Sequence, residues 1–288
     1  MRVDLLAGTA YNPAVMPAPV PTILVFDSGL GGLTVFSEVL KARPDARFVY
    51  AADDAAFPYG RLSEEALVAR VLTVMERLAV LHRPDLAVIA CNTASTLVLP
   101  HLRRRFPFPF VGTVPAIKPA AEITRSGVVT VLATPGTVAR DYTRGLVAAY
   151  ASGCRVNLVG STKLAAYAEA ELEGRPVPDA DLAAELAPCF VEEGGRRTDV
   201  VALACTHYPL LLPRLKALAP WPVAWIDPAP AIARRVVHLL GGPVPGHEEG
   251  DEESLAVFTA GRGLNEALRT ALQIKGLPAV TIEDWPLK

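Results

Sequence analysis

Two cysteines, Cys91 and Cys205, each follow an apolar run and precede small hydroxyl or amide residues. The first reads DLAVIA before CNTAST, and the second reads VVALA before CTHYP. A thiol at the end of a buried strand can serve as a thiolate, an acid–base partner or a metal ligand. A single buried cysteine is more often an inert core residue, but the repeated context favours a shared chemical role for this pair.

Two further residues are candidates to hold or move a thiol proton. Asp27 ends the apolar run TILVFD, and His207 follows Cys205 by two positions. Taken alone, Asp27 would suit a helix N-cap and His207 a structural histidine. Two thiols on opposite faces of one carbon would permit stereoinversion, because one thiolate removes a proton from Cα and the other thiol returns a proton to the opposite face. Such a reaction needs no cofactor.

The sequence around these residues alternates between strand-like and helix-like segments. Apolar runs predict strands at 22–27, 47–51, 86–90 and 109–112, and a second series at 128–133, 155–159, 199–204 and 222–226. Amphipathic segments such as 61–82 lie between them. This alternation predicts an α/β fold with parallel sheets covered by helices on both faces. One more strand, helix and strand are expected after position 254.

The two series follow one plan. The first opens with VFDSGLGG and the second with VLATPGTV, and each has its cysteine after a later strand. We therefore expect two similar doubly wound parallel-sheet lobes related by a pseudo-twofold axis, with the active site in the cleft between them. Ligands of open α/β sheets bind beyond the carboxyl ends of the strands, where both cysteines fall.

The segment GLGG at 29–32 also resembles part of a dinucleotide-binding fingerprint. It follows a strand, and Asp53 follows the next strand. However, Thr34 stands where the third glycine of GxGxxG is required, and the Asp27-Ser28 pair would place a carboxylate near a pyrophosphate. Nucleotide binding is therefore not favoured.

Composition excludes several classes of protein. The net charge is −2 and no basic stripe is present, so we expect no nucleic-acid partner. Four scattered cysteines without a CxxC pair indicate neither a disulfide framework nor a metal site. No run has transmembrane length, and residues 1–21 lack the apolar core of a signal peptide, so we expect a loose leader on a cytoplasmic protein without a membrane partner. The acidic, Gly/Pro-rich segment 241–254 indicates an exposed loop.

With these residues assembled, the chain resembles the glutamate racemases of the aspartate/glutamate racemase superfamily. The motifs that carry the resemblance are VFDSGLGGLTV, DDAAFPYGRLS, ACNTAST, TPGT and LACTHYPLL, in family order over roughly 22–240. The resemblance implies cofactor-independent interconversion of L- and D-glutamate, which supplies D-glutamate for peptidoglycan. It also implies a homodimer, and lobes formed by 22–97 with 208–288 and by 98–207.

The resemblance assigns a role to each matching position. Cys91 and Cys205 become the two acid–base thiols. Asp27 would assist the first thiol, and His207 would assist the second. The positions that match substrate-binding residues are Ser28, Asn92, Thr93 and Thr206 for the amino and α-carboxylate groups, Pro58, Tyr59 and Gly60 for the side-chain carboxylate, and Thr134 and Thr137 for the second-lobe wall.

One position departs from the family pattern. Many members carry a glutamate in the second lobe where this chain has Gly160, Ser161 and Thr162. Glu169 or Glu171 could take its place, and the sequence does not decide between them. Two other functions stay open: an aspartate racemase or related Cα isomerase, and a racemase-fold protein that acts chiefly by binding a partner.

Overall fold

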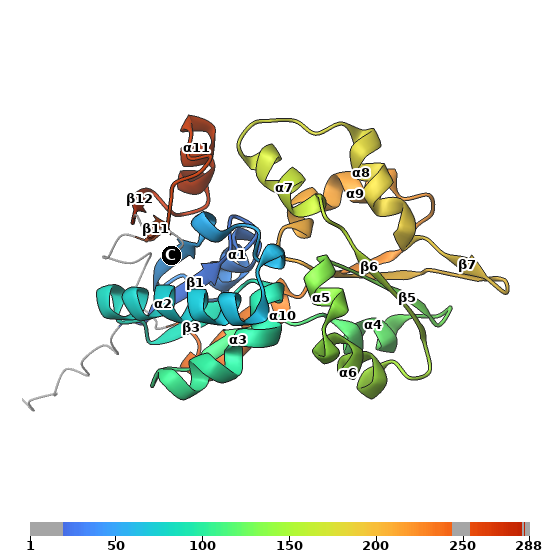
Figure 1. Cartoon of the computed structure of the whole chain (residues 1–288), viewed down its shortest axis with the longest axis horizontal. Coiled ribbons are helices and arrows are strands. Elements are labelled where there is room, and N and C mark those ends of the chain that lie inside the picture. The colour runs from blue at the N-terminus through green and yellow to red at the C-terminus, as the bar shows by residue number, and fades with distance from the viewer. Residues whose placement is uncertain (1–19, 244–253, 284, 286–288) are drawn as a thin grey trace, which may run out of the picture.

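A computed structural model of the 288-residue chain describes residues 20–243, 254–283 and 285. The predicted leader at 1–21 and the predicted acidic loop at 241–254 lie almost wholly outside these residues. Figure 1 shows two lobes side by side, the first carrying α1, α2 and α3 and the second carrying α4 to α9. The alternation of strands and helices matches the α/β expectation throughout.

The first lobe is built on a six-stranded parallel sheet with the order β12-β11-β2-β1-β3-β4. Its strands are β1 (Thr22–Asp27), β2 (Arg47–Ala52), β3 (Leu86–Ile89), β4 (Phe110–Gly112), β11 (Leu255–Phe258) and β12 (Ala279–Ile282). Helices α1 (Leu33–Ala42), α10 (Ala229–Leu240) and α11 (Glu266–Ile274) pack on one face, and α2 (Glu64–His82) and α3 (Asn92–Arg105) pack on the other. Because both faces are covered, the central strands read as continuous apolar runs.

The second lobe is built on a four-stranded parallel sheet with the order β10-β9-β5-β6. Its strands are β5 (Val128–Ala133), β6 (Arg155–Gly160), β9 (Val200–Ala204) and β10 (Ala224–Ile226). Helices α7 (Leu164–Leu172), α8 (Asp179–Leu186) and α9 (Leu212–Leu218) pack on one face, and α4 (Ile117–Ile123) and α6 (Asp141–Tyr150) pack on the other. The short α5 (Pro135–Ala139) follows β5, and β7 (Glu192–Glu193) and β8 (Arg196–Arg197) form an antiparallel hairpin.

Both sheets share one strand order. In the first sheet β1 lies between β2 and β3, and β4 lies beside β3. In the second sheet β5 lies between β6 and β9, and β10 lies beside β9. Cys91 directly follows the third-strand region in the first lobe, and Cys205 follows it in the second. The internal repeat therefore places the two thiols at equivalent points on the carboxyl edges of the two sheets.

The lobe boundaries differ from the predicted ones. Helix α3 connects β3 to β4, and both strands belong to the first sheet, so the first crossing lies at 113–116 rather than at 98. Likewise β10 pairs with β9 in the second sheet, whereas α10 packs against α1 in the first lobe. The chain therefore passes back to the first lobe at 227–228 rather than at 208. The reason is that α3 joins two strands of the first sheet and α9 joins two strands of the second, so each of these helices stays with the sheet of its own strands.

Helix α2 shows how local sequence sets the ends of these elements. The side-chain oxygen of Ser63 accepts a hydrogen bond from the backbone of Ala66 at 3.2 Å and caps the helix start. The helix ends at His82, and the next residue, Arg83, adopts a left-handed backbone with φ of 46°. Across the described part of the chain, no helix combines the length and the apolar character needed to cross a membrane.

Candidate active site

Both thiols line one small cavity between the lobes. All predicted site residues except Asp27 and Thr137 contribute to its wall, and the complete lining is Ser28, Phe57, Pro58, Tyr59, Gly60, Cys91, Asn92, Thr93, Thr134, Ala165, Cys205, Thr206 and His207. Phe57 and Ala165 were not predicted. Phe57 directly precedes the Pro-Tyr-Gly turn, and its ring lies 5.5 Å from that of His207, so the neighbouring motif was a usable signal.

The cavity is closed in this structure. Its volume is about 20 Å³, enough for about one water molecule. Arg140 in the second lobe bonds Glu64 in the first at 2.5 Å, and the side-chain amide of Asn265 donates to the carbonyl of Glu173 at 3.0 Å. An amino acid the size of glutamate therefore requires the lobes to separate before it can reach the thiols.

The thiol of Cys91 lies at the start of α3. It donates toward the hydroxyl of Ser28 at 3.8 Å. Burial, followed by the charge of Asp27, raises the pKa of the Cys91 thiol, and the backbone N–H of Ala94 and the Ser28 hydroxyl only partly oppose the shift. The structure therefore favours Cys91 as a neutral thiol, which can donate a proton.

Asp27 is fully buried beside this thiol. Its Oδ2 accepts a hydrogen bond from the backbone of Gly32 at 2.9 Å. Its Oδ1 has no hydrogen-bond partner among the described residues. No hydrogen bond joins Asp27 to Cys91 within the described residues, so the carboxylate acts on that thiol through its charge.

The second thiol belongs to a chain of three side chains. The sulfur of Cys205 lies 3.7 Å from Nδ1 of His207, and Nε2 of His207 lies 2.9 Å from Oε1 of Glu169. Glu171, the other candidate for the missing glutamate, bonds Arg214 at 2.5 Å instead. Glu169 therefore takes the place that the sequence left open.

The imidazole of His207 is poised to carry a positive charge. Burial lowers its pKa, but hydrogen bonds and charges from Cys205 and Glu169 outweigh burial, and the pKa is raised well above its usual value. The backbone N–H of Gly31 also lies 3.2 Å from Nε2. Because that N–H can bond only an unprotonated nitrogen, the charged ring favours the contact with Glu169. A cationic imidazole stabilises a thiolate beside it.

The glycine-rich loop at 29–32 packs against the side chains of Glu169 and His207. The backbone N–H of Leu30 donates to Oε1 of Glu169 at 2.8 Å. A Cβ atom on Gly29 would overlap the Glu169 carboxylate, and one on Gly31 would overlap the His207 ring. The glycines are therefore required for close approach of the second lobe, and side chains of this protein occupy the donors that a nucleotide phosphate would use.

Polar groups surround the rest of the cavity. The side-chain amide of Asn92 is buried and has no hydrogen-bond partner within the described chain. The hydroxyl of Thr93 lies 3.0 Å from that of Thr134 and 3.3 Å from that of Thr137. Thr137 is thus held behind the wall, where it orients the other two hydroxyls. Unpaired buried donors and acceptors at a cavity wall are suited to a charged amino acid.

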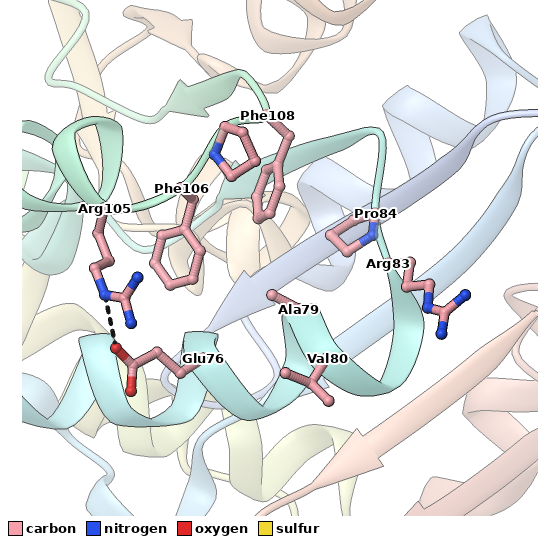
Figure 2. Close-up of a pocket in the computed structure, with 9 residues that line it drawn as sticks. Glu76, Ala79, Val80, Arg83, Pro84, Arg105, Phe106 and Phe108 are labelled. Atoms are coloured by element: carbon pink, nitrogen blue, oxygen red, sulfur yellow. Dashed lines mark hydrogen bonds and ion pairs between the residues drawn. The ribbon is translucent and has the colours of Figure 1, made fainter.

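A larger groove lies away from the thiols. Its volume is about 570 Å³, and it lies between the end of α2 and the segment that carries Phe106 and Phe108. Figure 2 shows both rings beside α2 and the bond of 3.0 Å between Arg105 and Glu76. The groove is lined by apolar side chains, two arginines and one glutamate, so it offers no thiol, hydroxyl or imidazole for chemistry. In the described residues, no three His, Cys, Asp or Glu side chains converge as a metal site would require.

Comparisons with known proteins identify the family of this chain. Residues 33–236 match the family described as Asp/Glu/Hydantoin racemase. The chain is 56% identical over 261 residues to a glutamate racemase of Brucella ovis, covering 90% of this chain and 94% of the relative. It is 53% identical over 272 residues to a glutamate racemase of Brucella anthropi, covering 92% and 98%.

A solved structure of a glutamate racemase is also similar to this chain. The crystal structure of the Escherichia coli glutamate racemase, in complex with L-glutamate and the activator UDP-MurNAc-Ala, has a TM-score of 0.84 and 42% identity, covering 92% of this chain and 98% of that one. The fold and site thus define a two-lobed α/β amino-acid racemase, and the chain belongs to the Asp/Glu/Hydantoin racemase family. Within that family these relatives support a glutamate racemase, an isomerase, and do not favour the aspartate alternative.

Proposed function

We propose that this protein interconverts L- and D-glutamate by proton transfer between Cα and two thiols. The observation that carries the proposal is that Cys91 and Cys205, from equivalent points of two repeats, line the same cavity. For one enantiomer the Cys205 thiolate accepts the Cα proton, and the Cys91 thiol donates its own proton to the opposite face. For the other enantiomer the transfers run in reverse. Each turnover replaces the Cα proton and inverts the configuration at Cα. Turnover of the first enantiomer leaves Cys205 as the thiol and Cys91 as the thiolate, which are the states from which the opposite enantiomer reacts.

The flanking residues support this assignment. Glu169 holds the His207 imidazole, which in turn stabilises the Cys205 thiolate. Asp27 and burial favour the protonated Cys91 thiol. A protonated Cys91 thiol and a raised pKa of the His207 imidazole beside Cys205 suit a two-base transfer.

The remaining cavity groups suit the substrate's charged ends. We assign Ser28, Asn92, Thr93 and Thr206 to the amino and α-carboxylate groups, the Pro58-Tyr59-Gly60 turn to the side-chain carboxylate, and Thr134 to the second-lobe wall, with Thr137 supporting it from behind. Donors aimed at the α-carboxylate stabilise the negative charge that develops when Cα loses its proton.

We also propose the setting in which this activity works. The protein acts without a cofactor, in the cytoplasm, as a homodimer, and its D-glutamate enters peptidoglycan and so supports the cell wall and cell shape. The near-neutral net charge of −2 supports the expectation that it acts without nucleic-acid or membrane partners.

The test follows Cα exchange and optical rotation together in D₂O, without added cofactor, starting from each glutamate enantiomer. Wild type is compared with Cys91→Ser, Cys205→Ser and, as a matched control, Cys154→Ser, a partly exposed cysteine. We expect inversion of both enantiomers with deuterium at Cα in wild type and the control. Each active-site variant should lose roughly a factor of a thousand in rate.

Other outcomes would replace parts of the proposal. Reaction of aspartate but not glutamate would correct the substrate. Full activity of the double variant Cys91→Ser/Cys205→Ser would refute the two-thiol mechanism. Absence of Cα exchange with either amino acid would leave the partner-binding alternative.

A second cavity supports regulation by an anionic ligand. It has a volume of about 630 Å³ and lies where the chain crosses between the lobes, and its charged lining is Arg103, Lys118, Arg234, Arg235 and Asp227. We propose that a nucleotide-sugar diphosphate, like the activator in the Escherichia coli structure, binds there. Calorimetry with UDP-MurNAc-Ala should show binding that Arg234→Ala weakens. Binding unchanged by this variant would place the activator elsewhere.

A further inference from the structure

Three buried polar side chains lie behind the turn at 57–60. Asp53 follows β2, Thr259 follows β11, and Arg70 comes from α2. Strands β2 and β11 are neighbours, and their register pairs Ala52 with Phe258. The register therefore brings Asp53 and Thr259 together, although they are far apart in the sequence.

These side chains form a continuous hydrogen-bond network. Oδ2 of Asp53 accepts a hydrogen bond from the hydroxyl of Tyr59 at 2.6 Å. Oδ1 of Asp53 accepts from Nη2 of Arg70 at 2.5 Å and from the hydroxyl of Thr259 at 2.8 Å. Arg70 also donates to the carbonyl of Trp285 at 2.8 Å. The cavity residue Tyr59 is thus tied to the C-terminal segment through a single carboxylate.

The residues before the turn are tied to the same segment. The hydroxyl of Thr259 accepts from the backbone of Ala55 at 3.0 Å. The carboxylate of Asp54 accepts from the backbones of Ala260 at 2.8 Å and Arg262 at 2.5 Å. The chain from 53 to 56 is therefore fixed against the loop that follows β11.

The network is buried but does not reach the cavity except through Tyr59. Asp53 is fully buried, and the side chain of Arg70 is 8% exposed. Burial, and then the charge of Asp53, raise the pKa of Tyr59, so its hydroxyl remains a donor to the carboxylate. Charge-assisted hydrogen bonds of this kind hold geometry tightly, because a buried charge that loses a partner is costly.

We propose that Asp53 and Thr259 are positioning residues for the turn at 57–60, and that the C-terminal segment 255–285 thereby sets the length of substrate side chain that the site accepts. The inference rests on the proposed function, in which this turn binds the side-chain carboxylate. The distance from the thiols to the turn then separates glutamate from the shorter aspartate, and a network remote from the thiols maintains it.

The test is Thr259→Val, which keeps the side-chain shape and removes the hydroxyl shared by Asp53 and Ala55. Its matched control is Thr270→Val, whose exposed hydroxyl donates to the Glu266 carbonyl within α11 and has no other hydrogen-bond partner among the described residues. We expect Thr259→Val to raise KM for glutamate about tenfold with kcat within about twofold of wild type. The preference for glutamate over aspartate should fall. The control should match wild type.

A second measurement separates this inference from the proposed function. Hydrogen exchange without substrate should be faster in Thr259→Val at the amides of Ala56, Arg61 and Leu62, which are bonded within this segment. Unchanged exchange, unchanged KM, or a loss confined to kcat would each overturn the inference. If wild type fails to racemise glutamate, the proposed function fails and the substrate role falls with it, while exchange still shows whether Thr259 positions the turn.

Discussion

Replacing Glu169 with Gln would remove the negative charge that lies beside the His207 imidazole. The amide of Gln still offers an oxygen as a hydrogen-bond acceptor. Oε1 of Glu169 accepts hydrogen bonds from both Leu30 and His207, and the carboxylate is 14% exposed. The substitution therefore tests charge rather than packing. Its effect should reach Cys205 only through the imidazole.

The expected size follows from the hydrogen bonds. A bond to a charged group contributes about 1.5–3 kcal/mol and a neutral one about 0.5–1.5 kcal/mol, so the midpoints differ by about 1.3 kcal/mol. That corresponds to about one pKa unit and about tenfold in rate. The charge of Glu169 raises the pKa of His207, so Glu169→Gln lowers it. The protonated ring is then lost at lower pH, and the alkaline limb of kcat/KM should move down by about one pH unit.

The assay measures kcat/KM against pH in both directions, beside Glu171→Gln as the matched control. Glu171 lies two residues further along α7 and bonds Arg214 instead of His207. Because the two enantiomers have equal free energies, kcat/KM must fall equally in both directions, which checks the data internally. A pH profile for Glu169→Gln that superimposes on wild type, or an equal loss in Glu171→Gln, would refute the role of Glu169.

Three other substitutions have expected outcomes. Gly31→Ala should place a Cβ against the His207 ring and cost about 1–3 kcal/mol of stability as well as activity; wild-type urea unfolding would contradict this. Phe36→Ala, in the fully buried first-lobe core, should cost about 3–5 kcal/mol in the same assay, and a loss below about 1 kcal/mol would show that the core refills the space. Asp199→Asn should cost about 0.5–1 kcal/mol near pH 7, because water screens this partly exposed carboxylate; burial raises the pKa of Asp199, but hydrogen bonds to Thr124 and the backbones of Arg125 and Ser126 outweigh it and lower the pKa. Its carboxylate stabilises the fold above its unfolded pKa and loses this effect as the pH falls through the folded pKa, so a difference from wild type that persists at low pH would contradict the charge argument.

Much of the site follows from local pattern. The strand preceding Cys91 is an apolar run bounded by polar residues, and so is the strand preceding Cys205. Parallel strands bring such positions to one edge of a sheet, whichever helices cover it. The order of strands and helices could therefore be predicted along most of the described chain.

Other features could not be predicted. Glu169 and Glu171 differ by two positions, and on a helix such residues face different directions, so only the placement of α7 against the first lobe selects Glu169. The lobe boundaries depend on which sheet β4 and β10 join, and hydrogen bonding between distant strands decides that. The contact of Thr259 with Asp53 likewise depends on the pairing of β11 with β2.

The repeated α/β plan, the two thiols and most of the small polar residues around them could be recognised from the sequence. These features depend on hydrophobic periodicity and on motifs that are continuous in the chain. Three features emerge only from the packed structure: the carboxylate that reaches His207, the burial of Asp27 near Cys91, and the hydrogen bonds behind the turn at 57–60. These depend on distances between segments far apart in sequence, which are fixed only when the two sheets and their helices pack.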